Sequence, residues 1–151
     1  MTGFFDVSYE TVYPQPTPER MAQAYFSRLF YSMHYEGFSY LFVFYGKHRV
    51  GKSLTAVSFC YILDPTFEAN MSTRIVYSSK GLIQAFKMIR DKNIHGAGIV
   101  VDEAGTGDMS SQRWYEDMAK LVMANLQAVG YLHPFICFVT QNFSFINTIA
   151  R

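Results

Sequence analysis

Residues 46–53 read Gly-Lys-His-Arg-Val-Gly-Lys-Ser and match the pattern GxxxxGK[ST] at every fixed position. The stretch follows an apolar run at residues 40–45 and precedes a helix-like segment at residues 54–63. Such a loop needs a strand before it and a helix after it, because phosphate oxygens bind the free N–H groups at the N-terminus of the helix. Both flanks are present, so the stretch predicts a P-loop within an α/β fold.

The predicted loop indicates a nucleoside triphosphate, expected to be ATP, as the ligand and Mg²⁺ as its counter-ion. Lys52 is expected to lie against the β- and γ-phosphates, and the hydroxyl of Ser53 is expected to take one coordination position on Mg²⁺. The residues expected to contact the nucleotide are Gly46, Lys47, His48, Arg49, Val50, Gly51, Lys52, Ser53 and Leu54.

From residue 40 onward, apolar strand-like runs alternate with amphipathic helix-like segments, which is typical of a parallel α/β sheet. One complete strand–helix unit separates the P-loop strand from the apolar run that ends at Val101. We therefore expect a three-layer P-loop NTPase of the RecA-like class, in which a further strand is inserted between these two. Strands are expected at residues 40–45, 74–78, 98–101 and 134–140, and helices at about 52–63, 80–92 and 110–130.

The domain organisation is expected to be simple. An irregular leader occupies residues 1–17, and one P-loop domain follows at residues 18–151. This domain begins with a helix at residues 18–37, capped by Thr17, and continues with a core at residues 40–151. A doubly wound sheet usually adds another strand at this point, so we expect a C-terminal part after Arg151.

The predicted N-terminal helix has two apolar sides. The face expected to pack on the sheet follows i, i+4 spacing and consists of Met21, Tyr25, Leu29 and Met33. The opposite side carries Phe26, Phe30 and Tyr31, so a contact between subunits is the alternative role of this helix.

The chain carries few charges for its size. Half of its 151 residues are hydrophobic and 17% are charged, against about 25% in an average globular domain. This low charge predicts apolar surface that meets a partner. The net charge is +1, so the overall field gives no argument for nucleic-acid binding, and a DNA contact would have to come from local patches.

Cysteines, histidines and hydropathy bear on metals and location. Cys60 and Cys137 each lie in an apolar segment and are expected to be buried and reduced, and the four histidines lack metal-site spacing. No apolar run reaches the roughly 18 residues of a membrane span, and the N-terminus has no secretory signal. A cytoplasmic location is expected, with membrane association only through a partner or a C-terminal part.

Polar residues follow two of the predicted strands. Asp102 and Glu103 come directly after an apolar run, where Asp102 is expected to hold Mg²⁺ and Glu103 to act as general base on the attacking water. Gln141 ends the last strand and is expected to contact the γ-phosphate or orient water. Because the carboxyl ends of parallel strands meet at one sheet edge, these residues are expected to converge on the P-loop.

Hydrolysis also needs a cation against the charge that builds on the γ-phosphate, and a neighbouring subunit often supplies it. Arg113 and Arg151 are the candidates for this role. A surface ion pair is the alternative role of each.

A resemblance to one family rests on four segments: GKHRVGKS at 46–53, IVVDEAG at 99–105, RWY at 113–115 and FVTQNFSFINTIAR at 138–151. They resemble the ATPase domain of zonula occludens toxin-like and filamentous-phage assembly proteins, within the FtsK–HerA group of P-loop motors. The similarity covers residues 40–151. It implies ATP hydrolysis by a homo-oligomeric ring that moves DNA or assembles virions for a virus or mobile element, in the cytoplasm of a host cell.

The resemblance also assigns roles residue by residue. It matches Lys52 and Ser53 to Walker A, Asp102 and Glu103 to Walker B, Gln141 to a sensor-like glutamine and Arg151 to a terminal arginine. Toxin-like members carry a membrane span and a periplasmic portion that residues 1–151 do not contain, so membrane association is expected through virion or membrane assembly partners or through a C-terminal part.

Three other functions stay open at this point. An AAA+-like replication initiator or helicase loader would share these motifs and continue into a helical lid. A non-hydrolysing ATP-binding interaction module would have no use for Glu103 and Gln141. A small-molecule kinase usually has its P-loop and Walker B strands adjacent.

Overall fold

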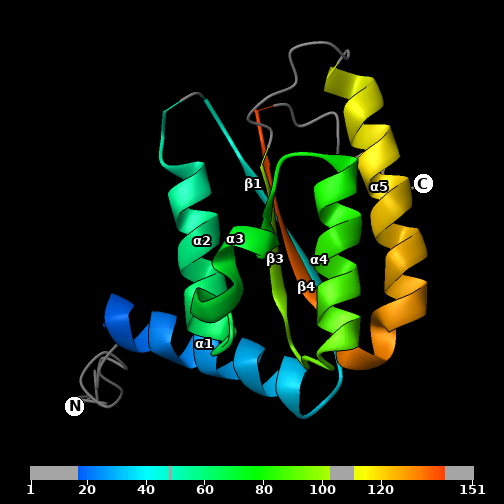
Figure 1. Ribbon diagram of the computed structural model, residues 1–151. Helices are drawn as coiled ribbons and strands as arrows, with labels where there is room; N and C mark the ends of the chain where they lie inside the picture. Colours follow the sequence, from blue (N-terminus) through cyan, green and yellow to red (C-terminus); the bar gives the residue numbers. More distant parts are fainter. Residues whose placement is uncertain (1–16, 48, 103–110, 142–151) are drawn as a thin grey trace, which may run out of the picture.

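The computed structural model describes residues 17–47, 49–102 and 111–141 of the chain. A sheet of four parallel strands, in the order β1-β4-β3-β2, forms its centre (Figure 1). Three of the strands lie within one residue of the segments expected from sequence, and β2 is shorter than expected. The strands are β1 (Tyr40–Tyr45), β2 (Ile75–Val76), β3 (Gly98–Asp102) and β4 (Phe135–Thr140).

Helices cover both faces of this sheet. The described helices are α1 (Pro18–His34), α2 (Lys52–Leu63), α3 (Met71–Arg74), α4 (Ser79–Asp91) and α5 (Ser111–Val129), with single 3₁₀ turns at Glu68–Asn70 and Gly130–Leu132. α1 and α2 pack on one face, and α4 and α5 on the other (Figure 1). The α/β architecture with a parallel sheet is therefore confirmed. None of the described helices is long and apolar enough to cross a bilayer.

The strand that leads into loop 46–53 and the strand that ends at Asp102 are not neighbours. β4 pairs with β1 on one side and with β3 on the other, so it lies between them. β2, from the strand–helix unit that separates the two in sequence, pairs with β3 at the far edge. A strand therefore lies between β1 and β3, as expected, and this strand is β4, the last strand of the described chain.

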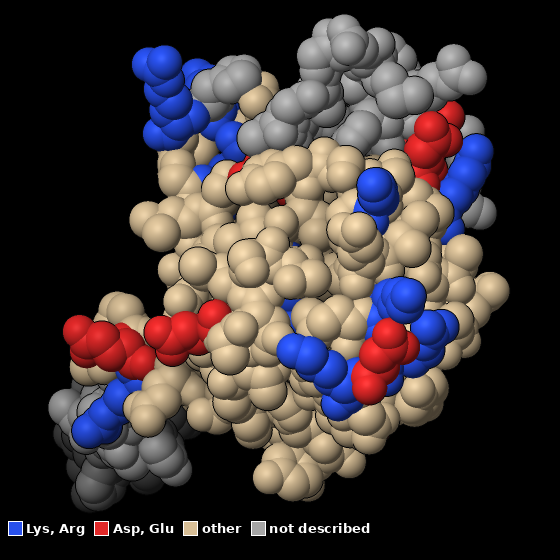
Figure 2. Space-filling model, viewed as in Figure 1, with Lys and Arg blue, Asp and Glu red and all other residues tan. Residues whose placement is uncertain are grey.

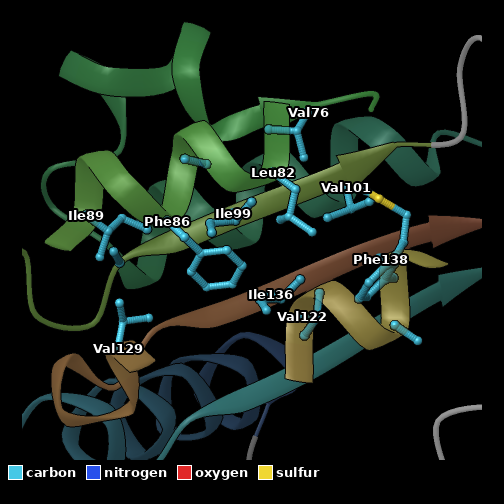
Figure 3. Close-up of a cluster of buried hydrophobic side chains, with 14 of the residues drawn as sticks. Val76, Leu82, Phe86, Ile89, Ile99, Val101, Val122, Val129, Ile136 and Phe138 are labelled. Atoms are coloured by element: carbon cyan, nitrogen blue, oxygen red, sulfur yellow. The ribbon is translucent and has the colours of Figure 1, made fainter. Parts of the chain in front are cut away.

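Two apolar clusters, one on each face, hold the layers together. On the α4/α5 face, Phe86 of α4 and Val122 of α5 meet Ile99 and Ile136 of the sheet (Figure 3). On the α1/α2 face, Ala56 and Cys60 of α2 pack against Val100 and Cys137. Every side chain of β4 is buried, as expected of a central parallel strand that is covered on both faces.

α1 follows its predicted start but only part of its predicted packing. The Oγ1 of Thr17 accepts a hydrogen bond from the N–H of Arg20 at 3.4 Å, so the N-cap has formed. Leu29 and Met33 are buried, whereas Met21 and Tyr25 are exposed. The expectation that all four pack on the sheet is therefore wrong, because Phe26 and Phe30, expected on the opposite side of the helix, pack against the cluster on the α1/α2 face instead.

Cys60 and Cys137 are both free and fully buried, as the sequence predicts. The Sγ of Cys60 donates to the Sγ of Cys137 across 4.0 Å, between α2 and β4. This hydrogen bond, together with burial, raises the pKa of the Cys137 thiol. Cys137 therefore stays protonated, and both side chains are part of the core.

A buried ion pair joins the C-terminal end of α2 to the sheet. Asp64 accepts hydrogen bonds from the guanidinium of Arg74 and, at 2.9 Å, from the backbone N–H of Gly98 at the start of β3. Thr66 contributes its N–H and hydroxyl to the same carboxylate, each at 2.8 Å. Burial lowers the pKa of Arg74, and the charge of Asp64 opposes this shift. Arg74 therefore ends α3. The prediction that a strand begins at Arg74 is wrong.

The replacement Asp64→Ala should destabilise the fold by about 3–5 kcal/mol, because it leaves the buried cation of Arg74 without its counter-charge. Urea unfolding measures this change. Asp91→Ala is the matched control, since its pair with Arg90 is about half exposed on both sides and should contribute less than about 1 kcal/mol. Equal losses for the two variants would contradict the central role given to the Asp64–Arg74 pair.

Candidate functional site

The loop at 46–53 leaves the end of β1 and enters α2, and three of its described residues have positive φ. Gly46 has φ 150°, Arg49 has φ 59° and Gly51 has φ 84°. Glycine adopts such angles without steric cost, whereas Arg49 holds a left-handed conformation that is uncommon for a residue with a side chain. Turns of this kind direct successive backbone N–H groups toward one side and make a concavity suited to an anion.

The N-terminus of α2 has no side-chain cap. Gly51 is its N-cap residue and supplies no side-chain hydrogen bond, and the first turn contains no acidic residue. By contrast, Thr17 and Ser78 cap α1 and α4 with their hydroxyl groups. The N–H groups and the positive end of the α2 dipole are therefore not offset by an anionic or capping side chain of α2's first turn, which suits a phosphate group.

Lys52, the first residue of α2, folds back over this loop. Its Nζ donates to the carbonyl oxygen of Gly46 at 2.8 Å and to that of Lys47 at 2.6 Å. An ammonium group has three N–H bonds, and these two acceptors use two of them. The third remains for a ligand oxygen, and the positive charge sits within the loop at half-buried Lys52.

A cavity of about 410 Å³ opens beside the loop. Its described lining combines the loop and first turn of α2 with the end of β4, and consists of Arg49, Val50, Gly51, Lys52, Ser53, Leu54, Val139 and Gln141. Lys and Arg side chains gather around the β1–α2 connection at the upper left of Figure 2, whereas the middle of that face carries few charges. The cavity thus lies in a locally basic part of a nearly neutral chain.

The strand register brings the predicted polar residues to the same sheet edge. Tyr45 is opposite Thr140, and Asp102 is opposite Val139. Gln141 follows β4 directly and lines the cavity, so it lies beside the loop as expected. Asp102 ends β3 one strand further away and does not line this cavity, although its half-buried carboxylate is at the same edge.

A second cavity of about 780 Å³ shares Gln141 with the first. Its other described lining residues are Tyr45, Gly46 and Lys47. Tyr45 and Val139 were not expected from the sequence as parts of the site. The signal for both is their position within two residues of a strand's carboxyl end, but only the register shows that these ends lie side by side.

Several predicted site residues lie outside the described residues. These are His48 within the loop, Glu103 after β3, and Arg151. Arg113 lies in the first turn of α5, but its side chain is not among those described. The roles predicted for these four residues stay predictions.

The described residues contain no cluster of three or more His, Cys, Asp or Glu side chains that could hold a metal by themselves. Mg²⁺ does not need such a cluster, because it keeps several waters and takes one or two protein oxygens together with substrate phosphates. The Ser53 hydroxyl and the Asp102 carboxylate are hard oxygen donors of this kind. The donor set therefore fits Mg²⁺ bound with a phosphate chain.

Comparisons with protein-family models, with curated proteins and with solved structures found no match to this chain. The geometry of the site is consequently the basis on which a function can be proposed.

The replacement Gly51→Ala should destabilise the protein by about 1–2 kcal/mol, measured by urea unfolding. An added Cβ at Gly51 meets no atom within 4 Å, so the cost comes only from its φ of 84°. Gly130→Ala is the matched control, because its Cβ also meets no atom within 4 Å and no positive φ is involved. A stability unchanged in both variants would show that the loop does not require this left-handed conformation.

Proposed function

We propose that loop 46–53 is a P-loop and that the protein is a Mg²⁺-dependent ATPase with a RecA-like fold. The observation that carries this proposal is the position of Lys52. Its ammonium group donates to the Gly46 and Lys47 carbonyls, and Lys52 lines the same cavity as Gly51, the uncapped N-cap residue of α2. A polyphosphate chain is the ligand that this combination fits best.

Each residue has a defined part in the proposed reaction. Backbone amides of residues 46–54 and the Lys52 ammonium bind the phosphates and balance their charge. Ser53 and Asp102 hold Mg²⁺, which neutralises charge on the β- and γ-phosphates. Glu103 accepts a proton from the attacking water, and Gln141 orients that water or the γ-phosphate.

The class of machine is proposed from the strand order together with the family resemblance. A strand between the P-loop strand and the Asp102 strand is typical of ring motors, and here β4 is in that place. Exposed apolar side chains on α1 and β1, among them Tyr25, Tyr31 and Leu41, fit a chain that assembles with copies of itself. We therefore propose a motor that moves DNA or assembles virions, with Arg113 or Arg151 acting across the subunit contact.

The replacement Lys52→Ala should weaken ATP binding tenfold to a hundredfold, because a charged hydrogen bond to phosphate contributes about 1.5–3 kcal/mol. Titration calorimetry with Mg²⁺ and ATP measures the affinity. Lys87→Ala, at an exposed position on α4, is the control and should bind as the wild type does. An unchanged affinity for ATP in a folded Lys52→Ala protein would contradict the P-loop assignment.

ATP turnover per subunit should rise with protein concentration and rise further with duplex DNA, because sites completed between neighbours need assembly. Glu103→Gln is the blank, since an amide cannot accept the proton and this variant should bind ATP without hydrolysing it. A rate per subunit that changes with neither protein concentration nor DNA would contradict the ring-motor proposal and favour a self-contained kinase or switch. A Glu103→Gln variant that keeps the biological function of the protein without hydrolysing ATP would favour the non-hydrolysing interaction module.

A further inference from the structure

The cavity beside the loop contains two kinds of surface. Backbone amides and the Lys52 ammonium suit the charged phosphates, but the aliphatic side chains of Val50 and Leu54 do not. Leu54 is 71% exposed and Val50 is 61% exposed, although both line the cavity. These side chains therefore present uncovered apolar surface directly beside a phosphate-binding concavity.

The roles proposed for Lys52 and Gln141 assign one end of the cavity to the terminal phosphate. Lys52 is held at the Gly46 and Lys47 carbonyls, and Gln141 stands at the exit of β4 on the side of Asp102. Leu54 lies on the first turn of α2, past Ser53, and is not in the second cavity that Gln141, Gly46 and Lys47 share. A triphosphate with its γ end at Gln141 consequently leads its nucleoside toward Leu54.

Resting on the proposed function, we propose that Leu54 is the surface on which the ribose and base of the nucleotide lie. Only that part of a nucleoside triphosphate has apolar surface to bury against an aliphatic side chain. An aliphatic side chain forms no hydrogen bonds with base edges, so Leu54 contributes equally to the binding of ATP and GTP.

The test compares three ligands by titration calorimetry in the presence of Mg²⁺: ATP, GTP and inorganic tripolyphosphate. Leu54→Ala should weaken both nucleotides about fivefold to tenfold, because part of a leucine side chain is no longer buried. Its affinity for tripolyphosphate should change less than about twofold by the same argument, since that ligand has no nucleoside. Leu54 is mostly exposed, so its replacement leaves the core intact.

Ile62→Ala is the matched control. Ile62 is 51% exposed near the other end of α2 and does not line the cavity, so its loss should leave all three affinities unchanged. An unchanged ATP affinity in Leu54→Ala, an equal loss for tripolyphosphate, or losses for ATP and GTP that differ by more than about threefold would each overturn the assignment.

The same titrations separate this assignment from the proposed function. Tripolyphosphate that binds Lys52→Ala about tenfold or more weakly than the wild type supports the P-loop, whatever Leu54→Ala does. Failure of the wild type to bind either ATP or tripolyphosphate overturns the proposed function and the Leu54 assignment together.

Discussion

The buried pair of Asp64 and Arg74 is the constraint on which the position of the site depends. Asp64 is the C-cap residue of α2, and its carboxylate holds both the Arg74 guanidinium and the N–H of Gly98. The packing of Ala56 and Cys60 against the sheet sets the direction of α2, and the ion pair anchors its C-terminal end. A helix is rigid over its 12 residues, about 18 Å, so these two constraints together set the position of its N-terminal end. Lys52 and Ser53 are at that end, beside the loop.

The strand order adds the second constraint. Because β4 lies between β1 and β3, its end comes between the loop and Asp102, and Val139 and Gln141 become part of the cavity wall. If β1 and β3 were neighbours, Asp102 would lie beside the loop and there would be no room there for Gln141. In the proposed ATPase, an amide at this position would contact a terminal phosphate or orient a water molecule. The topology of the sheet therefore decides which chemical groups face the loop.

Most elements could be predicted from the sequence because their signals are local. The bounds of β1 and α2 follow from an uninterrupted apolar run and from the loop pattern between them. The position of Arg74 could not be predicted, because its strand-like neighbours are overridden by an ion pair with a residue ten positions away. The exposure of Met21 and Tyr25 was missed for a related reason: α1 has two apolar sides, and periodicity alone does not say which of them faces the core. Membership of Val139 and Tyr45 in the site depends on register, which a single strand's sequence does not contain.

The left-handed conformation of Arg49 depends both on its own turn and on hydrogen bonds that Lys52 makes across the loop. A residue with a side chain in the left-handed region carries a cost of about 1 kcal/mol, and such strain persists only where the surroundings hold it. The bonds from Lys52 to Gly46 and Lys47 close the loop and hold the turn that contains Arg49. A loop already held in this shape loses little freedom when an anion binds, so more of the interaction energy appears as affinity. The strain at Arg49 is thus consistent with a loop whose shape is set before its ligand arrives, and the arginine adds a positive charge at the rim of the cavity.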